Sequence, residues 1–129
     1  VCFTNSTIYG IDLEYNNLKG PIPYSIGNLV NLLYLDLSNN LVSGSIPLSI
    51  GDMKQLIGLQ LNNNTITGWI PEMLRRIINV QTLYLNNNKI SGHIPNMFTD
   101  LLNLQYLDLS NNNLVSSIPE SLTKAINVW

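Results

Sequence analysis

The chain is poor in the residues that usually carry chemistry. It has one cysteine and one histidine in 129 residues, and only 11% of its residues are charged. Cys2 and His93 are far apart in the sequence, and no cluster of charged side chains resembles a catalytic triad, a metal set or a phosphate loop. We therefore expect no catalysis, no metal ion and no cofactor.

Charge and hydropathy also argue against two kinds of partner. The net charge is −2, and the six Lys and Arg residues are scattered along the chain. This gives no basis for binding nucleic acid or an anionic membrane surface. No run of about 18 apolar residues occurs, so we expect no membrane insertion in this segment.

A 24-residue repeat runs through the chain five times without an insertion or a deletion. Counted from the first residue of each copy, offsets 1, 4, 6, 11, 15, 19 and 22 are apolar in all five. A fixed period of this length with Leu at set offsets indicates a leucine-rich solenoid, in which each unit contacts only its neighbours. We divide the chain into a leader at residues 1–7, five repeats at residues 8–127 and the start of a sixth at 128–129. The copies are 8–31, 32–55, 56–79, 80–103 and 104–127.

The repeat predicts a strand and a turn. Offsets 4 and 6 alternate with polar neighbours, which is typical of a short strand with one buried face. Stacked copies would pair these strands into a parallel sheet. The predicted fold class is therefore an α/β repeat solenoid.

Asparagine dominates the turn after this strand. A turn inside a stack leaves backbone groups that need partners, and the Asn amide offers donors and an acceptor at once. We predict a structural ladder in which each Asn bonds its own turn and the next one. The ladder positions, all at offset 9, are Asn16, Asn40, Asn64, Asn88 and Asn112.

The second copy, LYLDLSNNLVSGSIPLSIGDMKQ, resembles the plant-type leucine-rich repeat LxxLxLxxNxLxGxIPxxIGxLxx. The resemblance covers residues 8–127. It implies a curved stack with a concave parallel β-sheet, a second short strand at the Gly-x-Ile-Pro side, and short 3₁₀ helices or loops on the convex side. Proteins similar to this are mostly extracellular, at the cell surface or in the cell wall. They include ectodomains of receptor-like kinases and receptor-like proteins, and polygalacturonase inhibitors, whose partners are peptides, proteins and sometimes glycans.

The resemblance also bears on the two ends of the chain. Val1-Cys2 resembles the end of an amino-terminal cap, which makes Cys2 a disulfide candidate; a half-buried free thiol is the alternative. Val128-Trp129 stop within a repeat. Two interpretations stay open, a slice of a longer protein or a unit that stacks end to end.

The exposed side of the predicted sheet is acidic. Four carboxylates fall at its offsets, whereas all six basic residues are expected on loops or on the convex side. We predict a binding site for a polar or basic peptide or protein, with tyrosines as contact residues. A generic solvated sheet face is the alternative to this binding site. For Asp12, Glu14 and Asp36 we favour simple solvated carboxylates over a weak Ca²⁺ site. The predicted ligand-binding residues are Asp12, Glu14, Tyr34, Asp36, Gln60, Tyr84, Tyr106 and Asp108.

Two further features concern the surface. Trp69 and His93 share offset 14 and are expected to stack one repeat apart on the flank, as a contact for a partner or sugar or as ordinary variable surface. Two sequons make Asn5 and Asn63 candidate glycosylation sites. A glycan on Asn63 would block part of the acidic face.

Three functions are consistent with these features. The first is an extracellular recognition module of a larger receptor-like or inhibitor-like protein. The second is a structural solenoid that self-associates end to end into a fibre or surface layer. The third is ice binding, against which the four carboxylates argue, because ice surfaces favour flat uncharged arrays.

Overall fold

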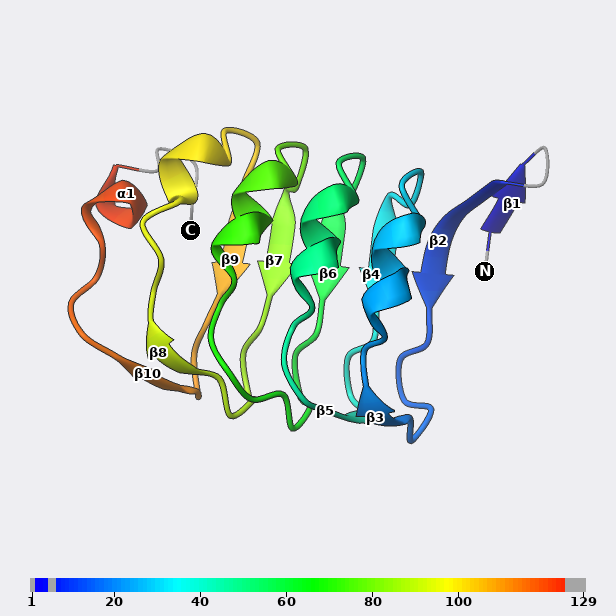
Figure 1. Cartoon of the computed structure of the whole chain (residues 1–129), viewed down its shortest axis with the longest axis horizontal. Helices are drawn as coiled ribbons and strands as arrows, with labels where there is room; N and C mark the ends of the chain where they lie inside the picture. The colour runs from blue at the N-terminus through cyan, green and yellow to red at the C-terminus, as the bar shows by residue number, and fades with distance from the viewer. Residues whose placement is uncertain (1, 5–6, 125–129) are drawn as a thin grey trace.

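The computed structural model describes the backbone of residues 2–4 and 7–124 and the side chains of residues 7–124. Its elements form a row of coils, each carrying a strand on one side and a short helix on the other (Figure 1). The expected repeat solenoid is confirmed. Asn5, the side chain of Cys2, the last residues of the fifth copy and the start of the sixth lie outside the described residues.

The main sheet has six strands in the order β1-β2-β4-β6-β7-β9. All pairs are parallel except the first, in which β1 runs antiparallel to β2. The parallel register places identical offsets opposite one another, as the constant repeat length requires. The strands are β1 (Cys2–Thr4), β2 (Thr7–Asp12), β4 (Tyr34–Asp36), β6 (Gly58–Gln60), β7 (Thr82–Tyr84) and β9 (Tyr106–Asp108).

A second set of short strands lies on the flank, ahead of the Ile-Pro dipeptides. β3 (Lys19–Pro21) pairs with β5 (Leu41–Ser43), and β8 (Ser91–His93) pairs with β10 (Asn113–Val115). Between these pairs the described chain has only an isolated bridge from Ser45 to Thr67. Lys19 therefore lies in a strand, which corrects the expectation that all basic residues fall on loops or the convex side.

Short helices cover the side opposite the main sheet. Each of η1–η3 and α1 begins directly after a proline, whose fixed φ suits a helix start and whose missing N–H needs no partner there. The last is a single α-helical turn rather than a 3₁₀ helix. The helices are η1 (Tyr24–Asn28), η2 (Leu48–Asp52), η3 (Glu72–Arg76), η4 (Phe98–Asp100) and α1 (Glu120–Thr123).

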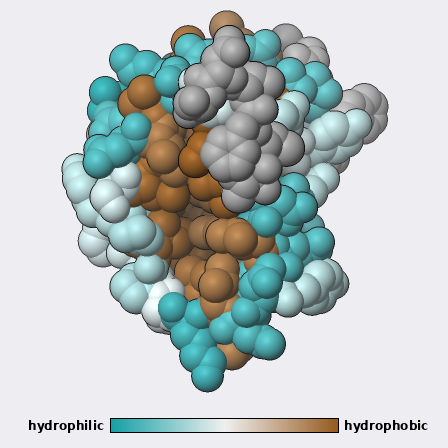
Figure 2. Space-filling view, turned by 90° about the vertical axis from the view of Figure 1, so that its right-hand side faces the viewer, coloured by the Kyte–Doolittle hydropathy of each residue, from teal (hydrophilic) through white to brown (hydrophobic). Residues whose placement is uncertain are grey.

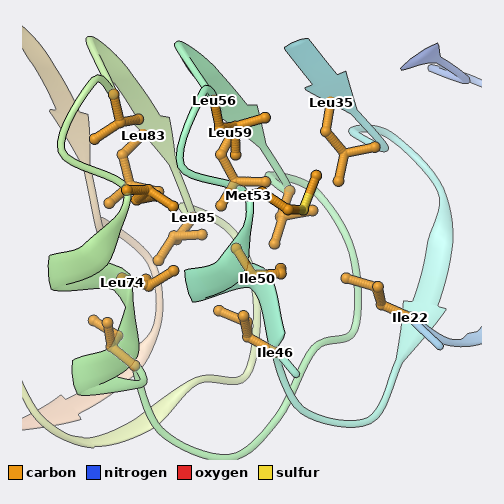
Figure 3. Close-up of a cluster of buried hydrophobic side chains, with 14 of the residues drawn as sticks. Ile22, Leu35, Ile46, Ile50, Met53, Leu56, Leu59, Leu74, Leu83 and Leu85 are labelled. Carbon is orange, nitrogen blue, oxygen red and sulfur yellow. The ribbon is translucent and has the colours of Figure 1, made fainter. Parts of the chain in front are cut away.

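The core is a column between the sheet and the helices. Leucines of the strands and isoleucines of the loops and helices point into it from both sides (Figure 3). In the central repeats these side chains are fully buried, as at Leu59 and Ile66, whereas Ile11 in the first repeat and Leu109 in the last are only partly buried. An apolar hollow of about 250 Å³ opens at the amino-terminal end, where Figure 2 shows a brown face framed by polar residues.

Candidate functional site

The asparagine at offset 9 links each turn to the preceding turn by hydrogen bonds. The Nδ2 group of Asn64 donates to the carbonyls of Leu61 and Asn62 in its own turn, at 3.1 and 3.2 Å. It also donates to Leu37 O at 2.9 Å, and its Oδ1 accepts the Val42 N–H at 2.9 Å, both in the preceding repeat. The bonds thus run to the preceding turn rather than the next, because the side chain points back along the stack.

The same contacts recur along the ladder. Asn40, Asn88 and Asn112 repeat this pattern with their own preceding repeats. Asn16, in the first repeat, is exposed, and its Nδ2 donates to Glu14 O of its own turn at 2.8 Å. The ladder therefore fixes the shape of the turns that carry the concave face.

The residue before each ladder asparagine has a left-handed backbone. Tyr15, Asn39, Asn63, Asn87 and Asn111 all have φ between 53° and 55°. Asparagine tolerates this conformation better than most side chains, which explains its presence at offset 8 in four of five copies. Sequence reasoning missed this requirement, although the column of asparagines was its signal.

The exposed concave side of the main sheet carries two rows of side chains. The strand register aligns offset 3 as Gly10, Tyr34, Gly58, Thr82 and Tyr106. The same register aligns offset 5 as Asp12, Asp36, Gln60, Tyr84 and Asp108. Seven of the eight residues predicted to bind ligand thus lie in two adjacent rows, and Glu14 follows β2.

The tyrosines of the first row are half exposed. Tyr34 has 53% and Tyr106 51% of its surface exposed, while Tyr84 in the second row is partly buried. A Cβ atom added at Gly58 would meet Tyr34 Cδ1 at 3.0 Å, so the ring of Tyr34 leans across the neighbouring strand. Because Gly58 has no side chain, it leaves room for the Tyr34 ring.

The aspartates of the second row have a structural bond as well as a free charge. Asp36 Oδ1 accepts the Ser38 N–H at 2.8 Å, and Asp108 Oδ1 accepts the Ser110 N–H at 2.9 Å. Asp12 makes the same bond to Glu14 N at 3.2 Å. Within the described residues, all three ion pairs lie elsewhere. The concave carboxylates therefore have no cationic partner there.

A chain of side-chain bonds follows the rim of this face. Asn63 Nδ2 donates to Asn39 Oδ1 at 2.8 Å, and Asn39 Nδ2 donates to Glu14 Oε1 at 3.0 Å. Asn63 is exposed, and its candidacy for glycosylation stays a prediction. Among the described side chains, no group of three His, Cys, Asp or Glu residues comes together, and the interpretation of Asp12, Glu14 and Asp36 as solvated carboxylates stays a prediction.

The flank residues Trp69 and His93 are both exposed, with 68% of the Trp69 surface free. His93 ends β8, whereas Trp69 lies outside the named strands. A Cβ atom at Gly92 would lie 3.5 Å from Trp69 Cβ, which places the tryptophan beside the β8 strand. Their role as a contact stays a prediction.

The family of the chain follows from sequence comparison. A family model of leucine-rich repeats in two copies matches residues 78–124, and a single leucine-rich repeat model matches residues 8–29 and 31–53. The chain belongs to the leucine-rich repeat family. No curated protein matches it in a sequence search.

Solved structures of plant receptors resemble the chain closely. The plant peptide hormone receptor RGFR1, in complex with RGF2, is 38% identical with a TM-score of 0.91 over 93% of this chain and 19% of that one. The ectodomain of the membrane receptor kinase GASSHO1/SCHENGEN3 from Arabidopsis thaliana is 36% identical with a TM-score of 0.91. The match covers 95% of this chain and 15% of that ectodomain chain. The BIR3–SERK2 complex from Arabidopsis thaliana matches at 33% identity with a TM-score of 0.89, covering 98% of this chain and 70% of the matched chain. The chain thus spans less than a fifth of the first two.

Proposed function

We propose that this chain is a recognition module of an extracellular receptor-like or inhibitor-like protein, and that its concave face binds a peptide or protein. The carrying observation is the concave face itself, which combines exposed tyrosines with four carboxylates and no Lys or Arg. Tyrosine is enriched at binding hot spots because it offers a large rigid surface and a polar tip.

The comparisons support this proposal from outside the chain. All three similar structures named above contain a partner: RGF2 with a peptide hormone receptor, CASPARIAN STRIP INTEGRITY FACTOR 2 with a receptor kinase ectodomain, and BIR3 with SERK2. From these similar structures we propose that this chain is also extracellular and that its role is binding rather than catalysis. No helix in the described part of the chain is long and apolar enough to cross a membrane.

Selection from a peptide library tests the proposal. The 129-residue chain is used to select displayed peptides, and each selected peptide is measured again on a Thr82→Arg variant. Thr82 lies between Gly58 and Tyr106 in the first concave row, so a long cation there obstructs the face. Ser45→Arg on the flank is the matched control. Loss of binding with Thr82→Arg alone supports the concave site, and loss with Ser45→Arg alone moves the site to the flank of Trp69 and His93.

End-to-end stacking is the second candidate, and one observation disfavours it. β1 pairs with β2 and so occupies the sheet edge on which a second copy would have to continue the parallel strands. A monomer by sedimentation at high concentration would exclude stacking, whereas filaments would restore it.

A further inference from the structure

Two of the concave strands present the same surface. The segments Tyr34–Asn40 and Tyr106–Asn112 have identical sequences, YLDLSNN, and each begins with a strand of the main sheet, β4 and β9. In each, a half-exposed tyrosine lies two residues before an aspartate whose Oδ1 accepts the N–H of the following serine. No hydrogen bond or ion pair among the described residues uses Oδ2 of either aspartate. The two segments therefore carry the same Tyr/Asp pair at the same offsets, with nearly the same tyrosine exposure and the same aspartate hydrogen bond.

The strands between these pairs are neutral. β6 contributes Gly58 and Gln60, and β7 contributes Thr82 and Tyr84, at the matching offsets. Gly58 is buried beneath the Tyr34 ring. The face thus has an anionic and aromatic position at each side of two uncharged strands.

The spacing of the pairs sets the ligand that spans them. β4 and β9 are three strand steps apart, or about 14 Å at roughly 4.8 Å per step. An extended peptide rises about 3.3 Å per residue, with alternate side chains on one side, so residues i and i+4 lie about 13 Å apart on the same side. Residues i and i+2 span only about 7 Å and residues i and i+6 about 20 Å, which are too short and too long.

The chemistry of each pair selects a cation. A carboxylate oxygen without a partner accepts from a guanidinium or ammonium group, and a tyrosine two residues earlier on the same face of the strand can attract the same cation through the negative face of its ring. Arginine suits both contacts best, because its planar group bonds the carboxylate and stacks on the ring. A lysine ammonium group can make both contacts, but it lacks the planar shape that lets arginine bond the carboxylate and stack on the ring together.

We propose that the Tyr34/Asp36 and Tyr106/Asp108 pairs are twin anchors for an extended peptide with two basic residues four positions apart. This inference rests on the proposed function, since it names the ligand class of the same concave face. Because the two anchors are alike, the peptide needs only the spacing and not a particular residue between its cations.

Peptides of defined spacing test the inference. The probes are blocked, otherwise uncharged Ser/Thr/Gln peptides with one arginine, or with two arginines two, four or six positions apart, measured by fluorescence anisotropy. We expect the four-spaced peptide to bind at least about tenfold more tightly than the others, because the second contact becomes intramolecular. Equal affinity of all two-arginine peptides would overturn the twin-anchor proposal.

Matched variants separate the anchors from general acidity. Asp36→Asn and Asp108→Asn each keep the Oδ1 acceptor and remove one charge. Each should lower the affinity for the four-spaced peptide to that of the unchanged protein for the one-arginine peptide. Glu72→Gln removes the same charge from η3, on the side opposite the concave face, and should change affinity less than about threefold. An equal loss with Glu72→Gln would overturn the inference, and melting curves check that all three variants fold.

The same experiment separates failure of this inference from failure of the proposed function. If no arginine peptide binds, yet library-selected peptides bind and are blocked by Thr82→Arg, the concave site stands and the twin anchors fail. If neither set binds, both fail.

Discussion

At the scale of single residues, the ladder asparagines show how position decides energy. Asn64 is 9% exposed and bonds backbone groups of two repeats, whereas Asn16 is exposed and its amide donates only within its own turn. Asn64→Ala leaves buried N–H and C=O groups without partners. We expect it to lower the free energy of unfolding by about 1–3 kcal/mol, measured by urea denaturation.

Asn16→Ala is the matched control for this prediction. It removes the same side chain at the same offset, and we expect a change within about 0.5 kcal/mol, as at other exposed sites. Equal losses in the two variants would mean that the bonds to the preceding repeat contribute nothing.

Ser116 is a strained residue where the other repeats have glycine. Its φ is +84°, close to the values of +71° to +90° at Gly20, Gly44, Gly68 and Gly92. A side chain in this region costs about 1–2 kcal/mol, partly offset by the greater freedom of glycine in the unfolded chain. We expect Ser116→Gly to raise the free energy of unfolding by about 0.5–1 kcal/mol. Ser117→Gly, beside it but without a positive φ, should bring no gain in the same urea titration.

These residues show what the sequence could and could not predict. The column of asparagines at offset 9 predicted hydrogen bonds to a neighbouring turn, because an amide is the small group with both donors and acceptor. It did not predict their direction, since side-chain orientation depends on the backbone. The 24-residue period and the repeated YLDLSNN segment also place two uncharged strands between the twin Tyr/Asp pairs, and the strand register agrees.

At the scale of elements, glycine at offset 20 sets how closely the helices pack. A Cβ atom at Gly51 of η2 would lie 2.6 Å from the backbone oxygen of Met73. The third repeat has Arg75 at this offset, and its guanidinium reaches Asp100 of η4 at 2.8 Å. The repeat thus accepts a long side chain where it can point outward to the next helix, a difference that the period alone did not reveal.

Gly51→Ala tests this packing. Because the obstructing atom belongs to the backbone, the methyl group forces η2 and η3 apart, and we expect a loss of about 1–3 kcal/mol in the free energy of unfolding. Gly10→Ala is the control, since nothing lies within 4 Å of its added Cβ atom. Thermal and urea denaturation of both variants measure the difference, and an unchanged Gly51→Ala would mean that the helices move apart at no cost.

At the scale of the whole molecule, charge is divided between two sides. The concave face has carboxylates without cationic partners, and two of the three ion pairs of the described chain, Arg75–Asp100 and Arg76–Asp52, join neighbouring helices on the convex side. A molecule with a net charge of only −2 can therefore attract a cationic partner to one side. This division follows from the repeat, because each offset returns to the same side in every copy.

Salt should act on binding and stability differently. Raising NaCl from about 0.05 to 0.5 M shortens the screening length severalfold, and we expect the four-spaced arginine peptide to lose about an order of magnitude in affinity. The convex ion pairs are solvent-exposed and contribute little, so the free energy of unfolding should change by less than about 1 kcal/mol. Anisotropy and urea titrations at the two salt concentrations measure both quantities. Binding that is insensitive to salt would assign the affinity to the tyrosine surfaces and remove the carboxylates from the site.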